Sequence, residues 1–188
     1  MITTGIFGGT FNPIHLGHLN VAQQVLSEQL ADEVWLMVSP LNPFKEGQAQ
    51  TDAQTRLGWV RKAVDNLPHI EASDFEFTLP QPNYTYRTLQ LLHKAYPNRC
   101  FKLIIGADNW QAFTRWKHYR KILQTTPLIV YPRPGYPIDR NDLPESACFL
   151  QTEEYDISAT EIRRRITAGE DISALVPEAI LTDLQSIQ

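Results

Sequence analysis

GGTFNPIHLGH occupies residues 8–18 of the chain. A short apolar run, residues 5–7, stands before it, and apolar residues recur after it at the spacing of one helical face. These apolar residues are Leu19, Val21, Ala22, Val25, Leu26 and Leu30. The pattern therefore predicts a strand, a glycine-rich turn and a helix, in that order.

A turn of this kind favours an anionic ligand. Gly8 and Gly9 have no Cβ, so a phosphate can approach the main chain, and the N–H groups that open a helix carry partial positive charge. His15 and His18 stand at the predicted helix start, where both imidazoles can face one ligand and donate to its phosphate oxygens. The structural alternative is a tight glycine turn, with His15 packed in the core and His18 capping the helix.

The eleven residues together resemble the signature of the HxGH nucleotidyltransferase superfamily. Members of that superfamily transfer an adenylyl or cytidylyl group from a nucleoside triphosphate to a phosphate. The resemblance implies phosphate contacts from Gly8, Gly9, Thr10 and Phe11, and catalytic roles for His15 and His18. Many members carry Asp where this chain has Asn12, and we assign Asn12 a role in the turn and none in catalysis.

Length and charge limit the function classes. The chain of 188 residues is long enough for one well-cored domain, residues 1–188, and short for two. Its net charge of −4 argues against a broad surface for nucleic acid or an anionic membrane. A phosphate ligand must therefore be held by local basic groups, as in a pocket for small molecules.

The expected location is the cytoplasm. The first residues lack the basic start and long apolar core of a secretory signal, and the strongest apolar run, residues 34–38, is too short to span a bilayer. Cys100 and Cys148 fit neither a metal site nor a disulfide framework, so we expect both thiols to be buried and reduced. The sequence leaves a homo-oligomer open.

Further apolar runs of strand length alternate with helical patterns. Strands are expected at residues 33–39, 70–77, 101–105, 128–131 and near 149–150. Helices are expected after Thr51 or Asp52, from residue 84, from Asp108 through Phe113, after Ser158 or Thr160, and near the C-terminus. The fold predicted is α/β, a Rossmann-like, doubly wound parallel sheet with helices on both faces, in one domain.

Lys45 lies in the loop that leaves the second predicted strand at its carboxyl end. Open α/β sheets bind ligands at that edge, and two prolines in the loop would hold the lysine over the site. We therefore assign Lys45 a catalytic role, the alternative being a solvated surface lysine. Arg56, in the next predicted helix, is expected at the surface, although the superfamily places an arginine close to the site near this point.

The middle of the chain resembles bacterial nicotinate-nucleotide adenylyltransferases. The matching segments are Tyr84-Thr85, Gly106-Ala107-Asp108, Trp116-Lys117 and Arg133-Pro134-Gly135. The resemblance implies that main-chain groups of Thr85 and Lys117 hold the nicotinate carboxylate, that Trp116 stacks on the pyridine ring, and that Arg133 helps bind the mononucleotide. Asp108, after a buried strand, can accept hydrogen bonds from ribose hydroxyls. The alternatives are a helix cap for Asp108 and core packing for Trp116.

ISATEIRRRI, residues 157–166, predicts a second phosphate site. Ser158 or Thr160 can cap a helix whose free N–H groups, together with Arg163, face an anion. The segment resembles a superfamily motif in which the hydroxyls and the arginine take the β- and γ-phosphates of ATP. Only Arg163 matches that motif, and Arg164 and Arg165 are expected at the surface.

The implied reaction joins ATP and nicotinate mononucleotide to give deamido-NAD and pyrophosphate. His18 and Lys45 would stabilise the transferred group, His15 and Arg163 the pyrophosphate, and Mg²⁺ would bridge the ATP oxygens. Three alternatives stay open. The acceptor could be nicotinamide mononucleotide or phosphopantetheine, the chain could bind a nucleotide without turnover, or His15 and His18 could bind zinc.

Overall fold

The computed structural model describes residues 1–40 and 51–186, and it contains one sheet of six parallel strands in the order β3-β2-β1-β4-β5-β6. The strands are β1 Ile2–Gly9, β2 Glu33–Val38, β3 Ile70–Ser73, β4 Arg99–Gly106, β5 Leu128–Tyr131 and β6 Ala147–Phe149. This order confirms the predicted Rossmann-like fold. The chain moves outward from β1 to β3, then crosses back and moves outward from β4 to β6.

The two strands at the centre, β1 and β4, mark the point where the winding reverses. β1 pairs with β2 from Thr4 opposite Glu33 to Gly9 opposite Val38. On its other side β1 pairs with β4, which brings Phe7 opposite Ile104. In open parallel sheets, ligands bind beyond the carboxyl ends of the strands at this reversal. The topology therefore places a ligand site where β1 and β4 end.

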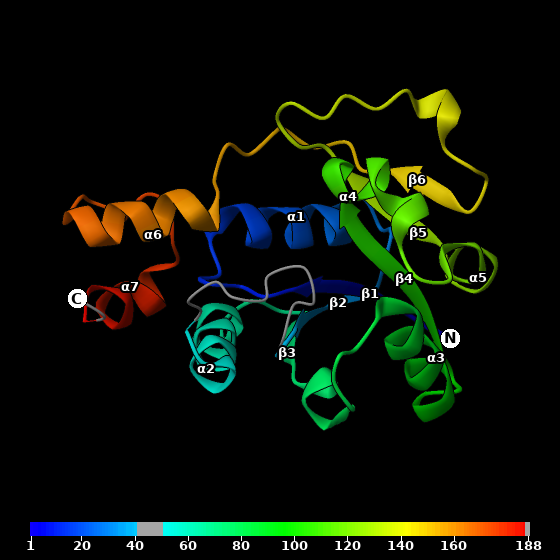
Figure 1. Cartoon of the computed structure of the whole chain (residues 1–188), viewed down its shortest axis with the longest axis horizontal. Helices are drawn as coiled ribbons and strands as arrows, with labels where there is room; N and C mark the ends of the chain where they lie inside the picture. The colour runs from blue at the N-terminus through cyan, green and yellow to red at the C-terminus, as the bar shows by residue number, and fades with distance from the viewer. Residues whose placement is uncertain (41–50, 187–188) are drawn as a thin grey trace.

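Helices cover both faces of the sheet. They are α1 Leu16–Ser27, α2 Ala53–Val64, α3 Thr85–Ala95, α4 Ala107–Gln111, α5 Tyr119–Thr125, α6 Ala159–Ala168 and α7 Glu178–Gln185. One buried cluster joins the sheet to α1, α2, α6 and α7, and the other joins it to α3 and α5. Figure 1 shows α6 and α7, in orange and red, at the opposite end of the molecule from α5.

Because helices pack on both sides of the sheet, both faces of strands β1 and β2 are apolar. In β1, Phe7 lies in the first cluster and Ile6 in the second, and in β2 Leu36 and Trp35 divide in the same way. Strands buried on both sides read as continuous apolar runs, which is the pattern that predicted them. Within residues 1–40 and 51–186, no helix is long and apolar enough to cross a membrane.

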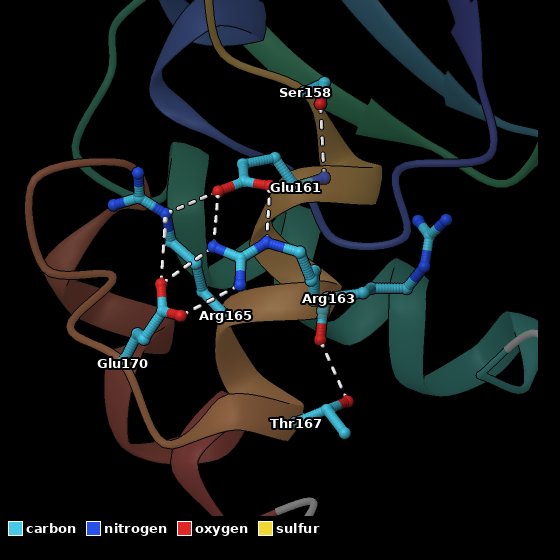
Figure 2. Close-up of polar contacts among 7 residues, drawn as sticks. Ser158, Glu161, Arg163, Arg165, Thr167 and Glu170 are labelled. Atoms are coloured by element: carbon cyan, nitrogen blue, oxygen red, sulfur yellow. Dashed lines mark hydrogen bonds and ion pairs between the residues drawn. The ribbon is translucent and has the colours of Figure 1, made fainter.

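Two helix starts that the sequence left as alternatives are resolved. The Asp52 carboxylate accepts the N–H groups of Gln54 and Thr55 at 2.9 and 3.1 Å, so Asp52 caps α2. The Ser158 hydroxyl accepts the Glu161 N–H at 3.2 Å and caps α6, as Figure 2 shows. These contacts confirm the predicted capping, and they place Ser158 at the helix start.

Two predicted elements are wrong in extent. β3 ends at Ser73, and a 3₁₀ helix, η2, occupies Phe75–Thr78 where the strand was expected to continue. The expected helix from Asp108 is two pieces, α4 and the 3₁₀ helix η3 at Phe113–Arg115, and Gly106 stands at its cap position. Packing decides both cases, because aromatic rings of these segments turn onto the second buried cluster. A last 3₁₀ helix, η4, spans Arg140–Asp142.

The prediction that both thiols are buried is wrong for Cys100. Cys100 is exposed, with its Sγ 3.2 Å from the Met1 Sδ, whereas Cys148 is half-buried. The reason is position, since Cys100 lies near the amino end of β4 and beside the exposed first residue of the chain. Both cysteines are free.

Candidate active site

The predicted phosphate turn lies at the carboxyl end of β1. Gly8 and Gly9 pair with Met37 and Val38 of β2, so they belong to the strand and not to the turn. At its carboxyl end the strand therefore extends two residues further than expected, and the turn comprises residues 10–15. It opens beside the ends of β4 and β5, at the edge that the topology assigns to a ligand.

The two glycines have different surroundings. A Cβ on Gly9 would lie 3.0 Å from the Phe11 Cζ, because the Phe11 ring is buried against this point. A Cβ on Gly8 would meet no atom of the described residues within 4 Å. Gly9 is therefore required by the packing of Phe11, whereas the space beside Gly8 is open to a ligand.

This difference predicts that two matched substitutions affect different properties, stability at Gly9 and ATP binding at Gly8. Gly9→Ala forces the buried ring to move and should lower the free energy of unfolding by about 1–3 kcal/mol. Gly8→Ala should leave stability nearly unchanged and weaken ATP binding, because the methyl group enters the open space. Denaturant unfolding and calorimetric titration with ATP measure the two effects. Equal stability of the two variants would contradict the assigned role of Gly9.

Two arginines hold the turn through its carbonyl groups. Arg163 donates from Nη1 to the Asn12 carbonyl at 2.7 Å and from Nη2 to the Thr160 hydroxyl at 3.1 Å. The Arg56 guanidinium donates to the Thr10 carbonyl. Arg56 is 1% exposed, so its predicted surface position is wrong. A buried guanidinium needs several hydrogen-bond acceptors, and main-chain carbonyls around the turn supply them.

His15 and His18 form a stacked pair at the start of α1. Their ring centroids are 3.6 Å apart with 26° between the planes. The His18 Nδ1 accepts the main-chain N–H of His15 at 3.3 Å, which leaves the proton of a neutral His18 ring on Nε2. His18 therefore offers a hydrogen-bond donor at Nε2. The alternative, in which His15 packs in the core and His18 caps the helix, is also correct in part. His15 is buried, and the His18 ring accepts a main-chain hydrogen bond at the helix start.

Burial controls the charge of His15. The ring is 3% exposed, and its Nδ1 has no hydrogen-bond partner among residues 1–40 and 51–186. This burial, helped by the nearby Arg133 guanidinium, lowers the pKa of His15 from 6.5 to about 3. His15 is therefore neutral near pH 7 in the free protein, and a bound triphosphate would favour the protonated ring.

The pKa of His15 predicts a pH dependence of stability. Because the pKa falls from 6.5 in the unfolded chain to about 3 in the folded chain, the unfolded chain binds more protons between these values. The His15 contribution is complete above pH 6.5 and is lost as the pH falls toward 3. Lowering the pH from 6.5 to 5 should therefore reduce the free energy of unfolding by about 2 kcal/mol. Unfolding measured over this range should depend less on pH in His15→Gln, and identical slopes would contradict the burial argument.

A pocket opens beside the histidine pair. It is lined by Phe7, His15, Gly17, His18, Val21, Tyr131, Pro132, Arg133, Tyr155 and Ile157. Of these, Tyr131 and Tyr155 are functional candidates that the sequence did not indicate. Burial raises the pKa of Tyr131 to about 12, so its hydroxyl keeps its proton. Tyr155 stands two residues before the motif that begins at Ile157, and this nearness is the one signal that points to it.

Gly17 is needed for the arrangement of this pocket. A Cβ at position 17 would lie 3.1 Å from the His15 Nδ1 and 3.5 Å from the Tyr155 Cβ. The glycine therefore leaves room for the buried His15 ring, and the segment before α6 passes the start of α1 at an ordinary contact distance. In this way the tertiary structure brings together two motifs that are far apart in the sequence.

Arg133 connects the histidine pocket with Asp108. Its Nε lies 3.7 Å from the Asp108 Oδ1, an atom that is buried and has no hydrogen-bond partner in the described part of the chain. A Cβ on Gly106 would lie 3.1 Å from the Arg133 Cγ, so a side chain there would displace this contact. The structure thus brings Asp108 and Arg133, both predicted to bind the mononucleotide, close to His15, which was predicted to be catalytic.

The two segments predicted to bind nicotinate are also neighbours. The Lys117 Nζ lies over the Tyr84 ring, 4.5 Å from its centroid, and the Tyr86 and His118 rings are 4.9 Å apart. The segment of Trp116 and Lys117 therefore lies against the start of α3, where Thr85 is the first residue. Trp116 is half-buried, with its ring 5.2 Å from Phe113, so packing accounts for part of its surface.

Arg164 is confirmed at the surface, whereas Arg165 is half-buried. Both donate to the Glu161 carboxylate, and Arg164 also donates to Glu170, with all of these distances between 2.8 and 2.9 Å. These hydrogen bonds lower the pKa of Glu161 to about 2. Figure 2 shows that the Arg163 side chain points away from this cluster.

Lys45 lies outside the described residues, so its predicted role is not tested. Within the described ranges, no group of three or more His, Cys, Asp or Glu side chains is placed to hold a metal ion. His15 and His18 therefore gain no further such ligand from this part of the structure.

The chain belongs to the cytidylyltransferase-like family, whose sequence profile matches residues 6–165. A relative from Bacteroides thetaiotaomicron is 43% identical over 91% of this chain and 85% of its own length, and it is named probable nicotinate-nucleotide adenylyltransferase. The agreement confirms the predicted relationship.

Solved structures agree on the fold. A putative nicotinate-nucleotide adenylyltransferase from Vibrio parahaemolyticus has a TM-score of 0.73 at 25% identity, covering 98% of this chain and 99% of its own. The Plasmodium falciparum nicotinic acid mononucleotide adenylyltransferase complexed with NaAD has a TM-score of 0.81 at 18% identity and covers 100% and 99%. The architecture is therefore shared along nearly the whole chain.

Proposed function

We propose that this chain transfers the adenylyl group of ATP to nicotinate mononucleotide, giving deamido-NAD and pyrophosphate in NAD biosynthesis. The observation that carries the proposal is the meeting of the histidine pair with Arg163 at one turn beyond the carboxyl end of β1. The names of the curated relatives support the choice of acceptor.

The ATP side of the site supplies positive groups and hydrogen-bond donors. The acceptor phosphate is already an anion, so the reaction needs positioning and charge stabilisation at the α-phosphorus, and no protein nucleophile. His18 would donate from Nε2 to the transferred group, together with Lys45. The outgoing pyrophosphate would be held by His15, Arg163, the main chain at residues 8–11, and the start of α6 with Ser158 and Thr160.

The acceptor would bind on the side of α3 and α4. Main-chain N–H groups at Thr85 and Lys117 would take the nicotinate carboxylate, with Trp116 against the pyridine ring. Asp108 would accept hydrogen bonds from ribose hydroxyls, and Arg133 would contact the mononucleotide. The nearness of Lys117 to Tyr84 supports this arrangement, because both nicotinate segments can then reach one ligand.

We propose Mg²⁺ as the metal that accompanies ATP. The described residues provide no carboxylate cage, which fits an ion held mainly by phosphate oxygens and water. When bound, Mg²⁺ would neutralise charge on the phosphates. The protein residues would orient the same phosphates through Arg163, the α6 start and the turn after β1. A cytoplasmic location and a homo-oligomer stay predictions.

The test is pyrophosphate release by the purified protein with ATP and Mg²⁺. Nicotinate mononucleotide, nicotinamide mononucleotide and phosphopantetheine are offered in parallel, and a His18→Ala preparation serves as the background for contaminating enzymes. We expect strong preference for the acid. Preference for another acceptor would overturn the roles of Thr85 and Lys117. Absence of turnover with every acceptor would favour a nucleotide-binding module instead.

A further inference from the structure

Arg56 on α2 is a buried cation, and within residues 1–40 and 51–186 its side-chain hydrogen bonds all reach main-chain carbonyl groups. Its Nε donates to Thr51 at 2.9 Å, and its two terminal nitrogens donate to Ser39 at 3.0 Å, to Pro40 at 3.1 Å and to Thr10. Burial lowers the pKa of Arg56, while Asp52 acts against this shift. An apolar side chain in the same space would leave these carbonyl groups without the donors that the guanidinium supplies.

The four carbonyls belong to three segments that are distant in sequence. Ser39 and Pro40 follow β2, Thr51 precedes α2, and Thr10 follows β1. The Ser39 N–H also donates to the Gly9 carbonyl at 2.8 Å. The planar guanidinium of arginine carries five N–H donors in a fixed geometry and can reach all four carbonyls, whereas the ammonium of lysine has three donors at a single point. Arg56 therefore fixes the end of β1 relative to the end of β2.

This contact determines the direction of one N–H group in the phosphate turn. A trans peptide is planar, so its N–H points opposite to its carbonyl. Because the Thr10 carbonyl points at Arg56, the Phe11 N–H points away from Arg56. Phe11 has a φ of 46°, a left-handed conformation that a bulky residue keeps only when its surroundings hold it. Arg163 holds the Asn12 carbonyl, two residues further along the turn, from α6.

We propose that Arg56 is a positioning residue for the nucleotide site, because its contact with the Thr10 carbonyl presents the Phe11 N–H to the phosphates of ATP. Arg56 itself does not touch the nucleotide. The proposal rests on the function proposed above and adds a residue to it, since the phosphate set predicted from the sequence contains Arg163 and not Arg56.

The test compares Arg56→Lys and Arg56→Gln with two controls on the same helix. Arg61→Lys changes an exposed arginine that pairs with Asp74, and Asp52→Ala removes the cap of α2 without touching the Thr10 carbonyl. Three quantities are measured: the thermal midpoint, the Kd for ATP by calorimetry without acceptor, and the KM for each substrate. ATP binding without acceptor separates this proposal from the proposed reaction, because it can be measured even in a protein that shows no turnover.

We expect Arg56→Lys to stay folded and to raise the Kd and KM for ATP by about tenfold, with the KM for nicotinate mononucleotide unchanged. Arg56→Gln should raise the Kd further, toward about 100-fold. If Arg56→Gln does not fold, the Kd of Arg56→Lys for ATP tests the proposal by itself. Asp52→Ala should lower the midpoint and leave the Kd for ATP unchanged. Wild-type ATP binding in folded Arg56→Lys would overturn the proposal, as would an equal loss of ATP affinity in Asp52→Ala.

Discussion

Replacing His18 with alanine is expected to lower kcat for pyrophosphate release by roughly two to three orders of magnitude, the loss typical of one preorganised donor. The His15 main-chain N–H fixes the His18 ring through Nδ1, and the two stacked rings restrict its orientation. The His18 ring is therefore held in one orientation before the substrate arrives. The KM for ATP should change much less than kcat, because the lost interaction forms mainly in the transition state.

His69→Asn is a suitable control for the loss of an imidazole. His69 is exposed and adopts a left-handed φ of 63°, which asparagine tolerates. Its carbonyl accepts the Val34 N–H, a main-chain contact that the substitution keeps. This variant should turn over like the wild type. Near-wild-type kcat in His18→Ala would remove His18 from the catalytic set.

Replacing Arg163 with alanine should lower kcat/KM for ATP by about 100-fold, as expected for loss of one charged donor to the phosphates. The guanidinium reaches the Asn12 carbonyl from α6, so it lies against the phosphate turn although 151 residues separate the two in sequence. Its loss removes a positive charge from the site and also releases the turn. Steady-state kinetics with ATP varied at saturating acceptor measures the effect.

Arg164→Ala is the matched control on the same helix. Arg164 is exposed and pairs with Glu161 and Glu170, and exposed ion pairs contribute little to stability. Figure 2 shows Glu161 and Glu170 on the side of α6 away from the Arg163 side chain. The control should keep wild-type kcat/KM for ATP. If Arg163→Ala and Arg164→Ala lost activity equally, a general effect of charge would replace the specific role of Arg163.

The fold could be predicted from the sequence because its signals are local. Apolar runs of strand length alternate with helical periodicity, and a parallel sheet covered on both faces is the arrangement that buries them. Predictions failed where packing overrode a local pattern, as at Phe75, where a 3₁₀ helix replaces the end of the expected strand. The predicted limits of α4 were wrong for the same reason, since its neighbouring aromatic rings pack on the sheet.

The candidate site could be predicted in part. The histidine pair and Arg163 stand in contiguous motifs, and the structure places all three at the turn after β1. Tyr155 was missed, and Arg56 was expected at the surface although the superfamily places an arginine close to the site near this point. An isolated arginine or tyrosine in a sequence has no pattern that distinguishes a buried position from an exposed one.

The sequence alone therefore determined the order of the main strands and helices, the motif that contains the phosphate turn, the second motif that carries Arg163, and the family. Only the tertiary structure decided that Gly9 makes room for Phe11, that His15 is neutral because it is buried, and that Arg56 and Arg163 hold the turn from two helices. The physical reason is the separation along the sequence over which each interaction acts. Periodicity and capping act over a few residues, whereas desolvation and the convergence of carbonyls on a guanidinium depend on segments that meet only in the folded chain.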